Sequence, residues 1–136
     1  MRGAVSELYP LDDVEALFVG AIKGHLADST PVATRAPATS PPRYVRLSRV
    51  GGPASLPFLD GPMLTFECWA TNDGAAEELC RRVRAFVRSL EGQKVGRAKL
   101  SGFTEVSGPA YFPDPDTPAY HRYQFTLQLR VRWARA

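Results

Sequence analysis

The clearest candidates for chemistry in this sequence are two carboxylates and one imidazole, Asp114, Asp116 and His121, which lie within eight residues. Such a group could hold a metal ion, or act as acid and base in a hydrolytic reaction. The segment that contains the carboxylates reads Asp-Pro-Asp-Thr-Pro, however. This composition is typical of a tight surface turn, because Asp side chains bind nearby backbone N–H groups and proline fixes φ. We therefore expect a turn without catalytic residues, in a protein that is not an enzyme.

Other familiar chemical motifs are absent from the sequence. It contains no phosphate-binding GxxxxGK loop, no GxGxxG, no HExxH and no GxSxG. The two cysteines, Cys68 and Cys80, are too few for a four-ligand zinc site, and we expect buried thiols. His25 falls late in a predicted helix, where an imidazole near the negative end of the helix dipole needs no further role. We expect no metal and no other cofactor.

Charge and aromatic content leave contacts with other macromolecules open. Residues 1–68 contain six Lys or Arg and seven Asp or Glu, whereas residues 69–136 contain eleven and seven. A basic second half permits contact with nucleic acid or acidic protein surfaces, although a solvated basic face explains it equally well. Aromatic side chains could stack on bases, but in strands they belong more often to a core or an interface. The aromatic candidates are Trp69, Tyr111, Phe112, Tyr120, Tyr123 and Trp133.

Length and composition indicate a single domain over residues 1–136. Hydrophobic residues make up 44% and charged residues 23%, which is close to the average of globular proteins and argues against a disordered chain. No apolar run approaches the roughly 20 residues of a membrane-spanning helix. The N-terminus also lacks the apolar region of a secretory signal. We therefore expect no contact with a membrane.

Apolar residues at helical spacing predict two helices. The first runs from Leu11 to about Asp28 and has three acidic residues in its first turn, where they suit the helix dipole. The second is capped by Asn72 or Asp73 and ends near Gly92, a suitable C-cap. Four arginines fall mostly off its apolar stripe and predict a solvated basic face: Arg81, Arg82, Arg84 and Arg88.

Alternating apolar and polar residues predict the strands. They cover residues 43–50, 63–70 and 99–107, then the segment from Phe125 to Trp133, with a short edge strand at 32–35. Gly102 indicates a bulge. Because these strands follow one another mostly without an intervening helix, we expect an α+β fold. It contains a mixed or antiparallel sheet of four to five strands, with two main helices packed on it.

Proline is concentrated in three connections, at about 29–42, 51–62 and 108–119. Of the 12 prolines, seven lie between residues 31 and 62 and four between 109 and 118. Long connections in a compact domain are usually functional, and proline lowers the entropy that a loop loses when it docks. The candidate contact residues in these loops are Gly51, Gly52, Pro53, Phe58, Leu59, Asp60, Tyr111, Phe112, Asp114 and Asp116. The candidate subunit-interface residues, from the strands, are Trp69, Arg130, Arg132 and Trp133.

The order of these segments resembles that of the tail terminator proteins of long-tailed bacteriophages that infect actinobacteria. The resemblance covers most of the chain, in loose patterns and without a signature motif. Its segments are Leu11-Asp-Asp-Val-Glu-Ala-Leu17, Arg43-Tyr-Val-Arg-Leu47 with the following Gly-Gly-Pro loop, Phe66-Glu-Cys-Trp-Ala70, Ala75-Ala-Glu-Glu-Leu-Cys80, Gly108-Pro-Ala-Tyr-Phe-Pro-Asp-Pro115 and Arg122-Tyr-Gln-Phe-Thr-Leu-Gln-Leu-Arg130.

The resemblance implies a structural virion protein at the tail–neck junction, assembled in the host cytoplasm. Tail terminators form a hexameric ring that caps the tail tube, stops its polymerisation and provides the surface for head attachment. The implied partners are further copies of this chain, the major tail tube protein and a head-completion or connector protein. Genomic DNA passes through the lumen without specific binding, so we expect the four arginines of the second helix to lie outside the lumen.

Three other functions fit the sequence less well. Another neck or head-tail joining protein of a tailed phage has a similar size. A generic basic binding module fits the charge of the second half of the chain. A small metal-dependent hydrolase would use Asp114, Asp116 and His121.

Overall fold

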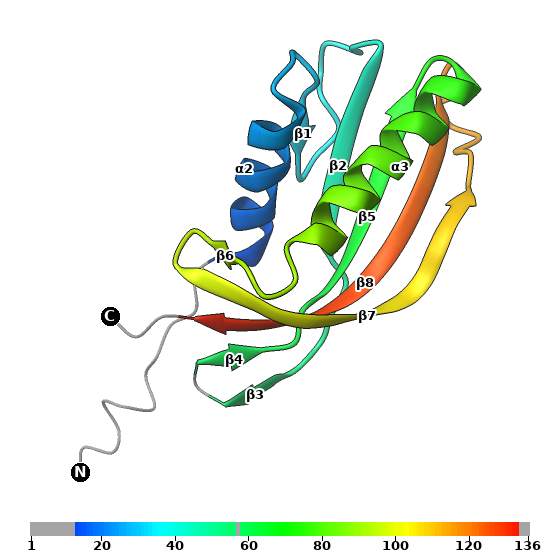
Figure 1. Ribbon diagram of the computed structural model, residues 1–136. Coiled ribbons are helices and arrows are strands. Elements are labelled where there is room, and N and C mark those ends of the chain that lie inside the picture. The colour runs from blue at the N-terminus through cyan, green and yellow to red at the C-terminus, as the bar shows by residue number, and fades with distance from the viewer. Residues whose placement is uncertain (1–12, 57, 134–136) are drawn as a thin grey trace.

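The structure is a computed structural model that describes residues 13–56 and 58–133. Within these ranges the chain forms two helices and eight strands (Figure 1). In chain order they are α2 (Val14–Leu26), β1 (Val32–Ala33), β2 (Arg43–Arg49), β3 (Ala54–Leu56), β4 (Leu59–Asp60), β5 (Met63–Ala70), α3 (Asp73–Ser89), β6 (Lys94–Val95), β7 (Ala98–Tyr111) and β8 (His121–Trp133). The predicted start of the first helix, Leu11 and Asp12, lies outside the described residues.

The two helices begin at side-chain caps. Asp13 accepts a hydrogen bond from the Ala16 N–H at the start of α2, and Asn72 accepts one from the Ala75 N–H at the start of α3. The C-cap of α3 is Leu90, whereas the sequence predicted Gly92. Gly92 has a φ of 80° but belongs to the following turn, where its N–H donates to the carbonyl oxygen of Leu100. Neither described helix has the length and apolarity that a transmembrane span requires.

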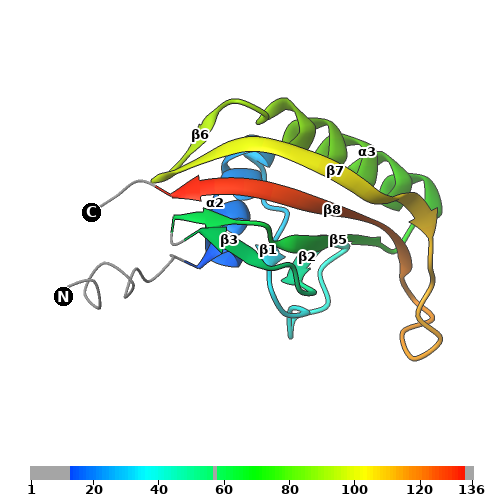
Figure 2. The ribbon, with the colours of Figure 1, turned by 90° about the horizontal axis from the view of Figure 1, so that it is seen from below.

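All eight strands belong to one mixed sheet that is organised around β8. On one side β8 pairs antiparallel with β5 over residues 121–128 and with β4 at residues 131–132. On its other side it pairs antiparallel with β7 along almost its whole length. The strand β2 lies beyond β5, and the short β1 adds to it in parallel. Figure 2 shows β7 and β8 as a long curved pair that crosses the molecule.

The described sheet has eight strands, more than the four to five predicted, because short strands lie in the connection 51–62 and in the segment after α3. The connection 51–62 contains β3 and β4, which continue the β2–β5 hairpin, and β6 precedes β7. The strand β1 is the predicted short edge strand. The strand β7 reaches Tyr111, beyond the predicted end at residue 107. Pro109 is tolerated there because this part of β7 is at the sheet edge and pairs, among the described residues, with β8 alone. The bulge expected at Gly102 is confirmed by the register shift there.

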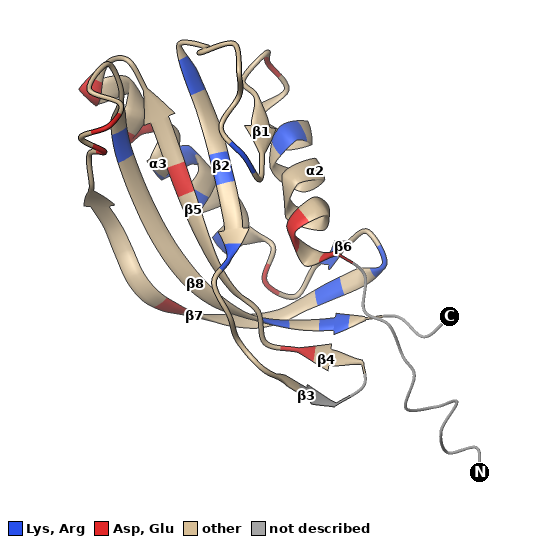
Figure 3. Cartoon of the chain, turned by 180° about the vertical axis from the view of Figure 1, so that it is seen from behind, with Lys and Arg blue, Asp and Glu red and all other residues tan. Residues whose placement is uncertain are grey.

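The hydrophobic core lies between the two helices and one face of the sheet (Figure 1). Phe18 and Ile22 of α2, together with Leu79 of α3, are buried over strand residues that include Phe66 and Phe125. The rings of Phe66 and Phe125 stack with centroids 4.8 Å apart across β5 and β8. The opposite face of the sheet has no helix over it in the described part of the chain, as Figure 3 shows.

Both cysteines belong to this core, as predicted. Cys68 of β5 and Cys80 of α3 are buried free thiols. Burial away from water raises the pKa of the Cys68 thiol well above its ordinary value, so it stays protonated at neutral pH.

A glycine bend divides the long β2–β5 hairpin into two parts. Gly51 and Gly52 have φ values of 129° and 95°, in the region that side chains rarely adopt. The Gly61 N–H donates to the Pro53 carbonyl oxygen at 3.0 Å, so the two strands of the hairpin bend together. A β-carbon on Gly52 would collide with the carbonyl oxygen of Gly61. The bend therefore depends on glycine at position 52, and it carries β4 onto the end of β8.

We predict that Gly52→Ala lowers the free energy of unfolding by about 2 kcal/mol, because the substitution combines a strained φ with a backbone collision. Gly20→Ala is the matched control. Gly20 is helical, and open space surrounds the position of its β-carbon, so this change should raise stability by up to about 1 kcal/mol. Urea unfolding followed by circular dichroism, at one protein concentration, measures both. Equal effects of the two substitutions would contradict the account of the bend.

Candidate interaction surfaces

The structure sorts the candidate contact residues of the sequence into two groups, at opposite ends of β8. The connection 51–62 lies beside the end of this strand, because β4 pairs with residues 131–132. The connection between β7 and β8 lies at its start (Figure 2). The first group contains Gly51, Gly52, Pro53, Phe58, Leu59, Asp60, Arg130, Arg132 and Trp133. The second contains Trp69, Tyr111, Phe112, Asp114 and Asp116.

Asp60 holds the glycine bend together from inside the subunit. Its side chain is 3% exposed and accepts two hydrogen bonds from the Arg49 guanidinium, at 2.8 and 2.9 Å. The same guanidinium donates to the carbonyl oxygens of Gly51 and Gly52, at 3.0 and 2.6 Å. Asp60 therefore acts as an internal anchor for the bend, which differs from the expected role of a contact residue.

Trp133 is likewise an internal residue. It is 3% exposed and belongs to the hydrophobic core. Its backbone N–H donates to the carbonyl oxygen of Phe58 at 2.8 Å, which attaches the tip of the β3–β4 hairpin to the end of β8. Its indole therefore presents little surface to another subunit. Arg130 and Arg132, which alternate with it along the strand, are exposed.

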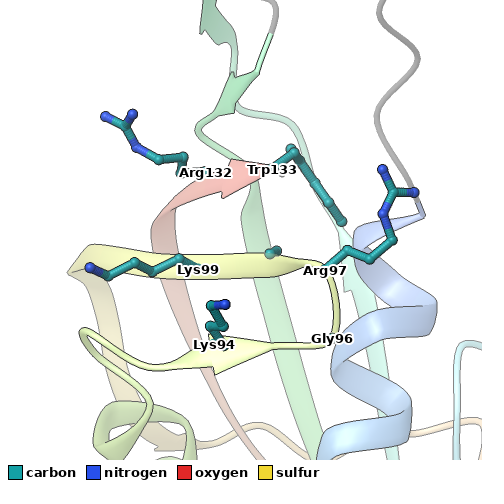
Figure 4. A pocket seen from close by; sticks show the side chains of 7 residues that line it. Lys94, Gly96, Arg97, Lys99, Arg132 and Trp133 are labelled. Carbon is teal, nitrogen blue, oxygen red and sulfur yellow. The ribbon is translucent and has the colours of Figure 1, made fainter. Parts of the chain in front are cut away.

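A basic depression lies beside these arginines, at the β6–β7 turn (Figure 4). It has a volume of about 300 Å³ and is lined by Lys94, Gly96, Arg97, Ala98, Lys99, Arg132 and Trp133. The two-residue turn at Gly96, with a φ of 59°, brings the lysines of β6 and β7 together. We call the surface formed by Lys94, Lys99, Arg130 and Arg132 the basic end.

The opposite end is built around an arginine between two aromatic rings. The Arg122 guanidinium lies 4.7 Å from the ring centroid of Trp69 and 5.1 Å from that of Phe112. Its Nε also donates to the Phe112 carbonyl oxygen at 2.6 Å. Trp69, which is 3% exposed, stacks on Tyr44 as well, with centroids 5.5 Å apart. Trp69 thus anchors the β7–β8 connection within the subunit, which differs from its expected place at a subunit interface.

Burial and hydrogen bonding fix the phenols of this aromatic cluster. Burial raises the pKa of Tyr44 to about 12. Tyr120 meets Tyr44 edge-on and donates a hydrogen bond from its hydroxyl to the carbonyl oxygen of Pro41, at 2.5 Å. The cluster therefore ties the two prolyl connections 29–42 and 108–119 to the same end of the sheet.

The acidic segment of the β7–β8 connection forms the predicted turn. The Asp114 carboxylate accepts a hydrogen bond from the Asp116 N–H at 2.9 Å, and the Asp114 carbonyl oxygen accepts one from the Thr117 N–H at 3.0 Å. His121 instead contacts the Tyr111 hydroxyl, 2.9 Å from its Nδ1. Across residues 13–56 and 58–133, no three His, Cys, Asp or Glu side chains are placed to hold a metal ion.

Aromatic side chains are exposed beside this turn. Tyr111 is 47% and Phe112 56% exposed, although both also contact neighbours within the subunit. Exposed aromatic rings of this size are enriched in the centres of protein interfaces. The described structure therefore leaves Tyr111 and Phe112 available for a partner at the start of β8.

The basic face expected on the second helix is largely neutralised. Arg84 donates two hydrogen bonds of 2.8 Å to the Glu105 carboxylate of β7, and Arg88 lies 3.4 Å from the same carboxylate. Arg81 pairs with Glu77 on its own helix, at 2.9 Å. The two pairs with Glu105 tie α3 to β7. The position of this face relative to a lumen stays a prediction.

We predict that Glu105→Gln lowers the free energy of unfolding by about 1 kcal/mol at neutral pH. Hydrogen bonds from Arg84 lower the pKa of Glu105 below its ordinary 4.5. The stabilisation is therefore fully present above pH 4.5 and is lost as the pH falls below it. Urea unfolding between about pH 7 and pH 3 should show the wild type and the variant converging in acid.

Glu91→Gln, at an exposed glutamate without an ion pair in the described structure, is the control. A constant difference across this range would contradict the role of Glu105.

The sequence reasoning missed two features of these surfaces. The Arg49–Asp60 pair joins residues from different parts of a bent hairpin, and no local pattern marks it. The basic depression had a local signal, because Lys94-Val-Gly-Arg-Ala-Lys99 alternates around a glycine, as in a short hairpin. A two-residue strand such as β6 is too short to show a clear period by itself.

Comparison with known proteins reveals a likeness of fold. No protein-family model matches the sequence, and no curated protein matches it. Among solved structures, the chain resembles one from a structure described as "Virion of native gene transfer agent (GTA) particle". The TM-score is 0.50, and the match covers 94% of this chain and 90% of that chain. The two sequences are 18% identical, so the likeness is one of fold alone.

Proposed function

We propose that this protein is a structural subunit of a virion. The observation that carries the proposal is the fold likeness to a chain of a gene transfer agent virion, because it spans nearly the whole length of both chains. Fold likeness alone is a weak guide to function. The support here is that the sequence pattern, considered without the fold, resembles a class of virion protein, the tail terminators.

Within the virion, we propose the role of a tail terminator, a ring of identical subunits on the tail tube. A head-to-tail contact between identical subunits closes into a ring when its rotation permits, and it needs two different surfaces on each subunit. The structure offers two such surfaces, with exposed arginines at the end of β8 and exposed aromatic rings at its start. In this proposal the ring stops tube polymerisation, offers a surface to a head connector protein and lets DNA pass.

We further propose that the protein works without catalysis. Asp114 accepts hydrogen bonds that form its own turn, and His121 bonds to Tyr111. These residues, the best candidates of the sequence for an acid and a base, thus have structural partners in the described part of the chain. The alternative within the virion is another neck protein that joins head and tail. Electron microscopy of labelled particles separates the two, because only a terminator contacts the last ring of the tube.

We predict that the purified protein forms a ring-sized oligomer that binds purified tail tubes. Size-exclusion chromatography with light scattering and co-sedimentation with tubes measure the two properties. The double variant Tyr111→Ser/Phe112→Ser should weaken assembly of the ring about thirtyfold, because it removes two exposed aromatic anchors from one of the two contact surfaces. Val106→Ser is the control, since Val106 is 51% exposed on the middle of β7. A monodisperse monomer that binds neither tubes nor connector would contradict the proposal.

A further inference from the structure

Four of the described cations that form no ion pair lie together at the basic end. Most arginines of the described chain pair with a carboxylate, among them Arg43, Arg49, Arg84 and Arg122. The four residues of the basic end form no ion pair with an acidic side chain in residues 13–56 and 58–133. All four are exposed.

Three of these cations stand in one row across neighbouring strands. Lys94 of β6 lies opposite Lys99 of β7, and Lys99 lies opposite Arg132 of β8 (Figure 4). Side chains directly opposite each other in an antiparallel pair are about 5 Å apart at Cβ, and like charges at this spacing destabilise the sheet. The row therefore costs the isolated subunit free energy. A carboxylate placed against it from outside would remove that cost.

The chain presents carboxylates at the other end of the same strand. Asp114 and Asp116 lie in the connection before β8, and Asp73 and Glu78 lie in the first two turns of α3. Figure 3 shows red segments where α3 and β8 begin, and blue segments near the turn between β6 and β7 and at the far end of β8. Glu78 and Asp116 are exposed and form no ion pair among the described residues. We call the surface formed by Asp73, Glu78, Asp114 and Asp116 the acidic end.

The two ends cannot neutralise each other within one subunit. Ten residues of β8 separate Arg132 from Arg122, which is on the order of 30 Å along the strand. At physiological ionic strength exposed charges are screened beyond about 8 Å. Within residues 13–56 and 58–133 the acidic end therefore cannot neutralise the basic end of its own subunit, whereas the acidic end of another copy can.

We propose that the basic end of one copy docks on the acidic end of the next copy, in a head-to-tail contact. The inference rests on the proposed function, since a ring requires one heterologous contact repeated around an axis. A second copy is favoured over nucleic acid because the chain itself carries the acidic end, which complements the basic end in charge. The two surfaces lie at opposite ends of the subunit, as a repeated head-to-tail contact requires. The exposed carboxylates of one subunit then lie against the row of Lys94, Lys99 and Arg132 in its neighbour.

The single variant Lys99→Glu separates folding from assembly. It places a carboxylate between Lys94 and Arg132, so the isolated subunit should become more stable and unfold at a higher urea concentration. The same change removes the central cation of the contact, so association should weaken about tenfold. Urea unfolding and light scattering measure the two effects. A variant that associates as the wild type does would overturn the proposal.

Exchange of charges between the ends tests whether these two surfaces meet. Lys99→Glu/Arg132→Glu places two carboxylates in the basic end, and Glu78→Lys/Asp116→Lys places two cations in the acidic end. Each variant alone should remain monomeric under conditions in which the wild type assembles, and an equimolar mixture should assemble again. Lys23→Glu/Arg35→Glu, which changes net charge equally at exposed sites away from both ends, should assemble as the wild type does.

The possible negative results contradict different proposals. A wild type that stays monomeric and does not bind tail tubes contradicts the proposed function itself. A wild type that assembles, with variants that assemble equally well or a mixture that does not recover, contradicts only the contact between the two ends. Loss of binding to a duplex DNA oligonucleotide in Lys99→Glu/Arg132→Glu, with unchanged assembly, would assign the basic end to nucleic acid instead.

Discussion

The pairing of β8 with neighbours on both sides is the interaction on which the rest of the structure depends. Its alternating residues give one face to the core, where Phe125, Leu127 and Leu129 are fully buried, and the other to the uncovered side of the sheet. The first part of β8 pairs with β5 and its end pairs with β4, on either side of the glycine bend. The strand β8 therefore spans both halves of the bent hairpin. The long axis of β8 thereby fixes where the loops and the charges of the subunit are placed.

Much of this fold could be predicted from local patterns, and the rest could not for physical reasons. The strict alternation before Trp133 and the apolar stripe of α3 show which face is buried, because neither depends on distant residues. The proline-rich connections were predicted as loops, yet β3, β4 and the end of β7 lie in them. The end of β7 was missed because an edge strand tolerates proline. The strands β3 and β4 were missed because a glycine bend continues a hairpin only with the support of distant contacts, such as that of Arg49 with Asp60.

The candidate contact residues divide into side chains that are exposed and side chains that are buried within the subunit. Phe112 and Arg132 are exposed as expected of contact residues, whereas Asp60, Trp69 and Trp133 are buried. Residue type alone does not distinguish a tryptophan at an interface from one in a core. The distinction requires the neighbours, such as Arg122 beside Trp69. The subunit exposes aromatic and acidic residues at one end and cations without ion pairs at the other. This polarity suits repeated assembly of identical chains.

Electron cryomicroscopy of the particle that contains this protein tests the central claim most directly, because it shows where the subunit lies and what its two ends touch. We predict a ring of identical subunits at the end of the tail tube, in which Lys99 of one copy lies against Asp116 of the next. A particle in which the subunits do not contact one another, or contact through the same end of both copies, would contradict it.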